Sequence, residues 1–504
     1  MDLGTLLEFA VGRSPHSVAI VEDEKRYTYG ELNAEANRLA SSLRKLGIGR
    51  RDRVMVLLKN RIESVCLFWA VQKLGAIFTP INYRMSGKDV QYCINDVEPK
   101  VIVYEKASQK VSTEFRFDVR PLLISVGMDD ADVAYRELVE KGSPEATWPA
   151  YPDDDIAVML YTSGTTGNPK GVPRSHKNEY TAAVAHIIQN AYERDDSTFG
   201  AMPLHHTMGL RSLVTMCILS GKYVITPDFD AGVVLRLLAS EKVNDLYMIP
   251  TMYHELLKSG GIQTYDLSSL RRIGYAGAPM SEGLVQECLR AFKPELFVNH
   301  YGSTEVYTIT TCSIPGEKPG CAGKAGINQL VRLVNPSLEA EPEDVVALGE
   351  IGQVIVHAGS DEAFKGYWNR PDLTRRAIRN NWYFTGDLGY YDEDGDLFVV
   401  GRVDEMVISG GEHISPLQVE KVLGAHPKVQ SAAIVGESDE RWGQIVVAYV
   451  VPSDPSLSVA ELDSFCKNHR SLSAYARPRK YIFVDNIPTG PNGKILRRAL
   501  VDAK

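Results

Sequence analysis

The sequence predicts an α/β protein with a large N-terminal domain of parallel-rich sheets flanked by helices, and a small C-terminal α+β domain. Two observations lead to this prediction. The chain has 504 residues, more than one hydrophobic core usually supports, so two or more domains are expected. From residue 1 to about residue 150, apolar runs alternate with helical patterns, which is typical of parallel strands joined by crossover helices.

The N-terminal alternation can be followed segment by segment. Apolar residues at helical spacing, among them Leu32, Ala36, Leu39 and Leu43, predict a helix that opens at 27–32. The following segments are predicted as a strand over 54–58, a helix over 64–74 and a strand over 77–80.

The last hundred residues or so have a pattern of their own. Ser415 is placed to cap a helix that begins with Pro416 and ends at Leu423. Ser458 opens a capping box with Glu461 at the start of another helix. Strands are predicted over 432–435, 445–450 and 481–484. This mixture predicts the small α+β domain.

Composition and charge describe an ordinary globular protein that does not act on nucleic acid. Hydrophobic residues make up 44% and charged residues 24% of the chain, and the net charge is −9, so any phosphate site must be local. The seven cysteines include no CxxC pair, which indicates reduced thiols in the cytoplasm. The N-terminus lacks the features of a signal peptide, and the apolar run at 65–71 is too short to span a membrane.

The most informative segment is Tyr161-Thr162-Ser163-Gly164-Thr165-Thr166-Gly167-Asn168-Pro169-Lys170-Gly171. The apolar run 156–160 predicts a buried strand before it, and helical spacing after it, with Ser175 as the cap, predicts a helix. We therefore expect a loop between a strand and a helix. Such a loop turns backbone N–H groups and hydroxyls toward one point, which suits a polyphosphate. It is not a Walker A loop, because no Gly-Lys-Ser/Thr closes it.

This segment resembles the signature loop of the adenylate-forming enzymes, which include acyl- and aryl-CoA synthetases, adenylation domains and luciferases. Further similar segments follow in the expected order along the whole chain, at 80–84, 202–210, 273–279, 299–305, 381–387, 401–412 and 487–495. The resemblance implies ATP, Mg²⁺ and coenzyme A as cofactors, and a small carboxylic acid as substrate. The small domain is most similar to that of bacterial 4-chlorobenzoate–CoA ligases, with Gly-Arg-Val-Asp, Ser-Gly-Gly-Glu and Arg-Trp-Gly-Gln in common.

The resemblance implies a nucleotide site built mainly from the segment 299–305. Tyr301 offers a ring to adenine and Asn299 offers an amide to the edge of the base. Thr304 offers a hydroxyl to the α-phosphate, and Glu305 offers a hard carboxylate to magnesium. The other nucleotide-site residues are Asp387 with its partner Arg402 for the ribose, Thr162, Ser163, Gly164, Thr165, Thr166, Gly167, Lys170, Gly277, Ala278, Pro279, His300 and Gly302.

The resemblance also implies a mobile small domain. Lys494, near the end of the chain, takes the position of the catalytic lysine that bridges the carboxylate and the phosphate. Asp404 takes the hinge position, which sets a large ATP- and acyl-binding domain at 1–403 and a small mobile domain at 404–504. Rotation about the hinge would withdraw Lys494 after adenylation and admit the thiol.

The acid and coenzyme A sites are implied in the same way. His206 takes the position beside the carboxylate pocket, and no Asp stands in 202–214 to pair with an amino group. Tyr307 would shorten or polarise the pocket, which favours an aryl or short acid over a long-chain fatty acid. The acid-site residues are His206, Tyr275, Gly302 and Tyr307. The coenzyme A residues are Arg84, Ser409, Gly410, Gly411, Trp442 and Arg477.

Several of these residues have an alternative explanation as structural or surface residues without a role in the site. Arg84 is also consistent with a surface ion pair, His206 with a structural histidine, Trp442 with a core residue and Arg477 with a solvated basic face. The acidic turn 392–396 resembles a calcium loop but lacks its terminal Glu. Two other functions stay open, a stand-alone adenylation enzyme that loads a carrier protein and a non-catalytic acyl or nucleotide sensor. A homodimer is also left open.

Overall fold

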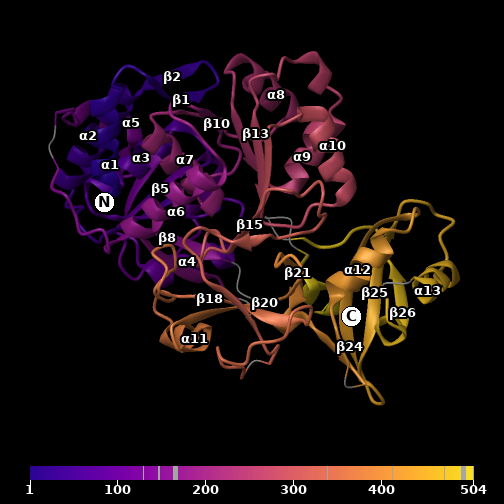
Figure 1. Cartoon of the computed structure of the whole chain (residues 1–504). Helices are drawn as coiled ribbons and strands as arrows, with labels where there is room; N and C mark the ends of the chain where they lie inside the picture. Colours follow the sequence, from indigo (N-terminus) through magenta and orange to yellow (C-terminus); the bar gives the residue numbers. More distant parts are fainter. Residues whose placement is uncertain are drawn as a thin grey trace. The chain divides into compact units, whose positions relative to one another are not determined.

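The chain divides into two compact units, which are described separately (Figure 1). Unit 1 comprises Met1–Leu330 and His357–Asn381, and unit 2 comprises Val331–Val356 and Trp382–Lys504. The computed structural model describes residues 1–128, 130–145, 148–162, 168–337, 339–410, 412–469, 472–489 and 495–502. The boundary at Asp404 between a large and a small domain stays a prediction.

Unit 1 contains a nine-stranded sheet of order β16-β15-β14-β13-β12-β10-β11-β1-β2. From β14 to β1 every neighbouring pair in this order is parallel, and antiparallel strands occupy the two edges. Its strands are β1 Val18–Glu22, β2 Lys25–Thr28, β10 Ser197–Phe199, β11 Lys222–Ile225, β12 Asp245–Met248, β13 Arg272–Ala276, β14 Leu296–Tyr301, β15 Thr310–Cys312 and β16 Lys324–Ala325.

A second sheet in unit 1 has seven strands in the order β7-β6-β5-β3-β4-β8-β9. All its pairs are parallel except β8 with β9. Its strands are β3 Arg53–Leu57, β4 Ile77–Pro80, β5 Val101–Glu105, β6 Leu122–Val126, β7 Val133–Ala134, β8 Ile156–Thr162 and β9 Lys170–Ser175. The predicted parallel-rich sheets are confirmed.

The helices of unit 1 begin where the sequence provides caps. The Thr28 hydroxyl accepts the N–H of Glu31 at the start of α2, and the Ser175 hydroxyl accepts that of Asn178 at the start of α6. The helices are α1 Leu3–Arg13, α2 Tyr29–Lys45, α3 Ile62–Lys73, α4 Gly87–Val97, α5 Tyr135–Lys141, α6 His176–Gln189, α7 Thr207–Leu219, α8 Ala231–Ser240, α9 Pro250–Lys258, α10 Glu282–Phe292 and α11 Pro371–Ala377, with 3₁₀ turns at Lys106–Ser112 and Ile262–Thr264 and the short strand β19 Ile378–Arg379.

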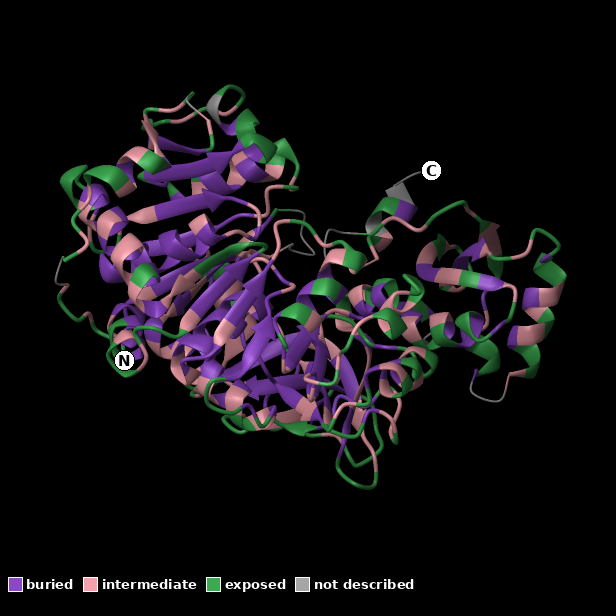
Figure 2. Ribbon diagram, turned by 90° about the horizontal axis from the view of Figure 1, so that it is seen from above, coloured by how far each residue is buried: buried purple, intermediate pink, exposed green. Residues whose placement is uncertain are grey.

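The core of unit 1 is layered. Helices α1, α2, α3, α6 and α7 share one apolar cluster with strands of both sheets, while α8, α9 and α10 cover the other face of the nine-stranded sheet. Helix α4 packs on the other face of the seven-stranded sheet. Figure 2 shows the strands buried and the outer helices exposed on one side only. This arrangement buries both faces of each sheet, as parallel strands require.

Unit 2 contains two smaller sheets. The first pairs β17 with β18 and β20 with β21, and the second has the order β23-β22-β25-β24 with β26 beside β25. The elements are β17 Val331–Val334, β18 Gly352–His357, β20 Trp382–Tyr391, β21 Leu397–Arg402, β22 Val407–Ser409, β23 Glu412–Ile414, β24 Val429–Asp439, β25 Gly443–Pro452, β26 Lys480–Phe483, α12 Pro416–Gly424, α13 Val459–Asn468, α14 Arg497–Asp502 and 3₁₀ turns at Val403–Glu405 and Ala474–Ala476. Ser415 caps α12 and Ser458 caps α13. The predicted α+β character is confirmed.

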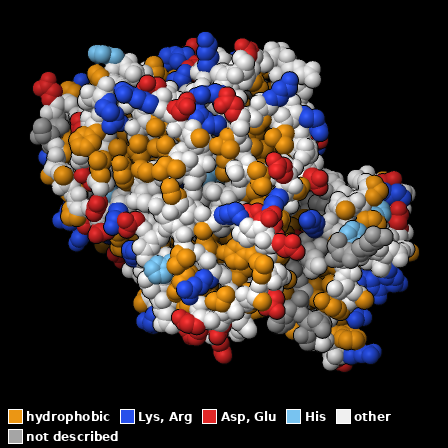
Figure 3. Space-filling model, viewed as in Figure 1, with side chains coloured by type: hydrophobic (Ala, Val, Ile, Leu, Met, Phe, Trp, Pro, Cys, Tyr) orange, Lys and Arg blue, Asp and Glu red, His pale blue; other side chains and the backbone are white. Residues whose placement is uncertain are grey.

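Lys, Arg, Asp and Glu side chains are interspersed over the face of unit 1 that Figure 3 presents. Within the described ranges of the chain, no helix is both long and apolar enough to cross a membrane.

Candidate active site

Three parallel strands of the nine-stranded sheet bring predicted site residues to one edge. Strand β10 leads toward His206, the N-cap of α7, and β13 ends directly before Gly277. Strand β14 ends at Tyr301, and the register pairs Ala276 with His300, so the ends of β13 and β14 lie side by side. Ligands of open α/β sheets bind beyond such carboxyl ends.

Glu305, the predicted magnesium ligand, is buried and held at both its carboxylate and its backbone. The Tyr367 hydroxyl donates a 2.6 Å hydrogen bond to Glu305 Oε1. The Glu305 carbonyl accepts from the Arg174 guanidinium at 3.1 Å and from the Phe364 N–H at 2.9 Å. Arg174 is itself fully buried and paired with Glu179 at 2.9 Å. The carboxylate is thus fixed before any ligand binds.

Tyr367 also connects Glu305 with Lys170, the last predicted residue of the signature loop. Lys170 Nζ lies 3.5 Å from the Tyr367 hydroxyl and 4.7 Å from the centre of its ring. A lysine and the carboxylate predicted to bind magnesium therefore contact the same tyrosine. Neither Tyr367 nor Arg174 was predicted as a site residue, because neither stands in a segment with a recognised chemical motif.

The signature loop lies in a β-hairpin, not between a strand and a helix as predicted. Strands β8 and β9 are antiparallel, and Thr162 pairs with Lys170 across the base of the loop. Strand β9 was not predicted, because Gly171 and Pro173 interrupt its pattern. A proline is tolerated at this position because β9 is an edge strand of its sheet. Thr162 is half-buried at the end of β8, and the predicted residues 163–167 lie outside the described residues.

The stem of this hairpin is fixed by the residue after Tyr367. The Trp368 N–H donates to the Gly171 carbonyl at 2.9 Å, and its indole N–H donates to the Asp96 carbonyl at 3.1 Å. The Tyr161 hydroxyl donates to the Asp96 carboxylate at 2.6 Å. The two ends of the loop are thereby tied to the segment that positions Glu305.

Gly302 is required by close packing at the end of β14. A Cβ added there would lie 2.2 Å from the Tyr307 carbonyl oxygen, so no other residue fits without moving the backbone. Thr304 is half-buried, whereas Gly302 and the predicted turn Gly277, Ala278 and Pro279 are exposed. The chain therefore folds back on itself between Tyr301 and Tyr307, which is how Glu305 comes to be buried.

Two predicted nucleotide residues are engaged inside the protein. The Asn299 side-chain amide donates to the Cys321 carbonyl at 2.7 Å, and His300 is buried with its Nε2 3.0 Å from Asn190 Oδ1. Tyr301, at the end of the same strand, is half-buried. Asn299 and His300 shape the strand, and their nucleotide roles stay predictions.

His206 occupies the N-cap position of α7, and its side chain makes no capping hydrogen bond to the described residues of the helix. Burial lowers the pKa of His206 to about 4, so the ring is uncharged at neutral pH. The ring of the neighbouring His205 lies against it at a tilt of 48°, with ring centres 4.5 Å apart. Burial, together with His206 and Arg84, holds the pKa of His205 well below its usual range. A neutral histidine offers a hydrogen bond to a carboxylate without a competing charge.

The two tyrosines predicted for the acid site are both buried. Tyr275 packs against Phe297 with ring centres 5.5 Å apart, in the cluster that α8, α9 and α10 cover. Tyr307 lies under the Arg174 guanidinium, 3.8 Å from ring centre to Cζ. Their contacts are with the protein core, and their contact with an acid stays a prediction.

Unit 2 carries the predicted ribose and hinge residues. Arg402 donates to the Asp387 carboxylate at 2.6 Å and to the Asp404 carboxylate at 3.0 Å. Burial alone would lower the pKa of the Arg402 guanidinium, but Asp387 and Asp404 outweigh it and hold that pKa above its ordinary value. Arg402 therefore fixes Asp387 and joins it to the residue predicted as the hinge.

The coenzyme A residues of unit 2 gather around Trp442. Gly410 has a φ of +62°, and a Cβ there would lie 2.8 Å from the indole ring. The indole is half-buried, and two guanidinium groups lie near its ring centre, that of Arg441 at 4.9 Å and that of Arg479 at 4.4 Å. Ser409 is buried in β22, and Gly411 lies outside the described residues. Trp442 is thus half-buried rather than part of the core, and its contact with coenzyme A stays a prediction.

Three further predicted residues are placed as follows. Arg477 forms a 2.6 Å ion pair with Asp463, while Arg84 is exposed beside the Tyr83 ring. Lys494 lies outside the described residues. The catalytic role of Lys494 therefore stays a prediction.

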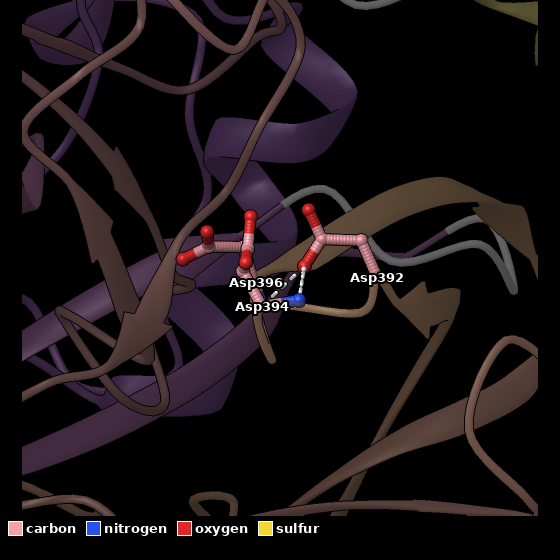
Figure 4. Close-up of side chains that lie close together, drawn as sticks. All are labelled: Asp392, Asp394 and Asp396. Atoms are coloured by element: carbon pink, nitrogen blue, oxygen red, sulfur yellow. Dashed lines mark hydrogen bonds between the residues drawn. The ribbon is translucent and has the colours of Figure 1, made fainter.

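The acidic turn after β20 is a hairpin turn, as expected. Asp392, Asp394 and Asp396 lie with one carboxylate oxygen each within 4.8 Å of the others (Figure 4). The Asp392 carboxylate accepts the N–H groups of Asp394 at 3.1 Å and Asp396 at 2.8 Å. This is the pattern of an Asx turn, and it explains the aspartates without a metal.

Comparison with known proteins identifies the family. Residues 7–368 match the model of the AMP-binding enzyme family, and residues 418–494 match that of the AMP-binding enzyme C-terminal domain. The chain therefore belongs to the AMP-binding enzyme family. It is an ATP-dependent, AMP-forming acid–thiol ligase, and the resemblance to the adenylate-forming superfamily is confirmed.

Relatives match over nearly the whole chain. The long-chain-fatty-acid–CoA ligase FadD13 of Mycobacterium tuberculosis is 32% identical over 501 residues, covering 99% of this chain and 98% of that protein. A feruloyl-CoA synthase of an Amycolatopsis species is 33% identical over 491 residues, covering 96% and 95%. The o-succinylbenzoate CoA synthetase of Bacillus subtilis, solved with its acyl-adenylate intermediate, matches with a TM-score of 0.88 and 29% identity, covering 100% and 99%. The same enzyme has been solved with ATP and a magnesium ion.

Proposed function

We propose that this protein is a carboxylic acid–CoA ligase. It joins an acid to ATP to form acyl-AMP and pyrophosphate, and then transfers the acyl group to coenzyme A with release of AMP. The acid is an aryl or a short- to medium-chain carboxylic acid. The observation that carries the proposal is the contact of Lys170 and Glu305 with Tyr367, because it gathers a cation and a metal-binding carboxylate at the base of the signature loop.

The residues present fit magnesium and ATP. Glu305 supplies a hard carboxylate oxygen, and the Thr304 hydroxyl stands one residue before it, which are the donors that Mg²⁺ prefers. When bound, Mg²⁺ supplies charge neutralisation on the phosphate chain. The Tyr367 hydroxyl donates to one carboxylate oxygen of Glu305 and so fixes the orientation of the carboxylate.

The first half-reaction must bring two anions, the carboxylate and the α-phosphate, into contact. Lys170 beside the signature loop contributes positive charge, and Lys494 would bridge the two reacting groups. The neutral imidazole of His206 donates a hydrogen bond to the acid. Asp387, oriented by Arg402 at 2.6 Å, accepts the ribose hydroxyls. Each group stabilises charge that develops at phosphorus or fixes the nucleotide for in-line attack.

The second half-reaction needs a thiol to approach the adenylate. Gly410 presents bare backbone beside the Trp442 indole, which leaves room for the narrow pantetheine chain. The Arg479 guanidinium, 4.4 Å from the centre of the Trp442 ring, offers a cation to the phosphates of coenzyme A. A rotation about Asp404 would move Lys494 away from the adenylate and bring the surface around Gly410 and Trp442 toward it.

A panel of carboxylic acids, read by pyrophosphate release, tests the proposal. The expected result is acid-dependent release from ATP, followed by thioester formation when free coenzyme A is added. Pyrophosphate release that leads to thioester only with a phosphopantetheinylated carrier protein would instead establish a carrier-loading enzyme. ATP binding without turnover for any acid would establish a sensor.

A further inference from the structure

Three arginines of the described chain are buried, and one of them differs from the other two. Arg174 is paired with Glu179 at 2.9 Å, and Arg272 is paired with Asp196 at 2.6 Å and Asp245 at 2.8 Å. Arg211 is only 2% exposed, yet among the described residues it forms no ion pair. A buried charge without a counter-ion is costly, and buried charges in proteins are therefore normally paired.

The groups that surround Arg211 are neutral acceptors and neutral bases. Its two terminal nitrogens donate to the Thr308 and Tyr247 hydroxyls, and its Nε–H is buried without a partner among the described residues. His186 and His300 lie against the same Tyr247 ring, with ring centres 4.8 and 5.2 Å away.

Arg211 carries the charge among the side chains of this cluster, because the two histidines beside it are neutral. Burial, with a contribution from Arg211, holds the pKa values of His186 and His300 well below their usual range, so both rings are neutral. The buried Glu362 lies beyond ion-pairing distance, and its carboxylate accepts from Asn328 at 2.9 Å. Burial raises the pKa of Glu362, which Arg211 and Arg174 oppose at longer range. Glu362 therefore acts on both arginines at a distance and, among the described residues, forms no ion pair with Arg211.

The location of Arg211 connects it with the acid site. It stands on α7, the helix that His206 caps, and one turn after Met208. Met208 and Tyr247 pack in one cluster with Ala276, the residue before Gly277. Its other partner, Thr308, directly follows Tyr307. Arg211 and its two partners, Tyr247 and Thr308, therefore each lie next to a segment that is predicted to bind the acid.

We propose that Arg211 is the specificity-determining residue of the acid site and binds a second carboxylate at the far end of the substrate. The substrate class is then a dicarboxylic acid, of which one carboxylate reacts near His206 and the other supplies the counter-ion that Arg211 lacks. Thr308 and Tyr247 hold the guanidinium in place and offer hydroxyls to the same anion. This inference rests on the proposed ligase function and narrows its substrate.

Matched acids test the inference in the unmodified enzyme. Straight-chain acids of three to six carbons and benzoic acids are each compared as the monocarboxylic acid, the hydroxy acid and the dicarboxylic acid, by pyrophosphate release. We expect kcat/KM for the best dicarboxylic acid to exceed that for its monocarboxylic counterpart by roughly 10- to 100-fold, the effect of a buried hydrogen-bonded charge pair. Turnover of monocarboxylic acids as efficient as that of dicarboxylic acids at every length would overturn the inference and leave the ligase function intact.

Substitution of Arg211 provides the second test. Arg211→Met, which keeps length but removes charge, should lower kcat/KM for the dicarboxylic acid by roughly 10- to 100-fold, and should change it for the monocarboxylic acid by only a few-fold. For Arg211→Lys, kcat/KM for the dicarboxylic acid should lie between the values for the unmodified enzyme and for Arg211→Met. Thr215→Val, a buried substitution one turn further along α7, serves as the control and should change neither value. An equal loss for both acids would contradict the assignment.

Thermal stabilisation provides a readout other than the rate of turnover and requires no substituted variant. With the unmodified protein, ATP and the dicarboxylic acid together should raise the Tm above the value with ATP and the monocarboxylic acid. Equal Tm values would also overturn the inference. Release of pyrophosphate with no acid of the panel would instead refute the proposed function itself.

Discussion

Replacement of Tyr367 by Phe tests the contact that orders the ATP site. The substitution removes one hydroxyl, whose hydrogen bond to Glu305 Oε1 is 2.6 Å long. The ring stays in place, so its contact with Lys170, 4.7 Å from Nζ to ring centre, is retained. A buried carboxylate thereby loses a donor, while packing is unchanged.

The magnitude follows from the kind of bond that is lost. Hydrogen bonds to charged groups contribute about 1.5–3 kcal/mol, which corresponds to a decrease of roughly 10- to 150-fold. We expect this decrease in kcat/KM for acid-dependent pyrophosphate release and in the apparent affinity for Mg²⁺. Calorimetric titration of the protein with ATP at several Mg²⁺ concentrations measures the second effect without turnover.

A buried tyrosine elsewhere in unit 1 supplies the control. The Tyr253 hydroxyl donates to the carbonyls of Leu246 and Gly274 at 2.9 Å each, so Tyr253→Phe loses bonds in the sheet without touching Glu305. It should lower the Tm and leave the Mg²⁺ dependence unchanged. The reasoning is refuted if Tyr367→Phe lowers the Tm to the same extent but leaves the Mg²⁺ dependence unchanged.

Three further predictions follow from the fold and the proposed mechanism. Lys494→Ala should reduce adenylation by about 10²–10³-fold but spare thioester formation from a preformed adenylate, and equal loss in both half-reactions would contradict a role confined to the first. Asp404→Pro should slow thioester formation more than adenylation, whereas Asp404→Ala, which loses the same carboxylate without stiffening the backbone, should affect it less; identical profiles would argue against the hinge. His176, buried at the start of α6 where its Nδ1 accepts the Leu3 N–H, has its pKa lowered by burial to about 4. Because its folded-state pKa lies below the unfolded value, the free energy of unfolding should fall by up to about 3 kcal/mol as pH decreases from about 6.5 to about 4. Urea unfolding of the native protein and of His176→Gln checks this, and the variant should lose that part of the pH dependence.

The local signals in the sequence predicted much of the fold. Ser175 and Ser415 cap α6 and α12 as expected, because a hydroxyl at an N-cap depends only on its own backbone. The strands β3 and β4 were predicted because their apolar runs are buried on both faces. The β8–β9 hairpin was missed because Pro173 and Gly171 are weak strand formers, and only the edge position in the sheet permits them.

The site was predicted where a motif concentrates its chemistry, and was missed where distant segments meet. The pairing of Asp387 with Arg402 was implied by the family resemblance, and the two side chains form a 2.6 Å hydrogen bond. The contacts of Tyr367 with Glu305 and of Arg211 with Thr308 join residues 62 and 97 positions apart. No local pattern encodes such contacts, because they depend on how the sheet brings its loops together.

The central claim is that one protein couples adenylation of an acid to transfer of its acyl group to coenzyme A. The most direct measurement is a single-turnover experiment with radiolabelled ATP and the best acid, followed by addition of free coenzyme A. We predict one pyrophosphate per active site before coenzyme A is added, and one AMP with one thioester after it. Release of ADP and phosphate, or an adenylate that coenzyme A leaves unchanged, would contradict the account.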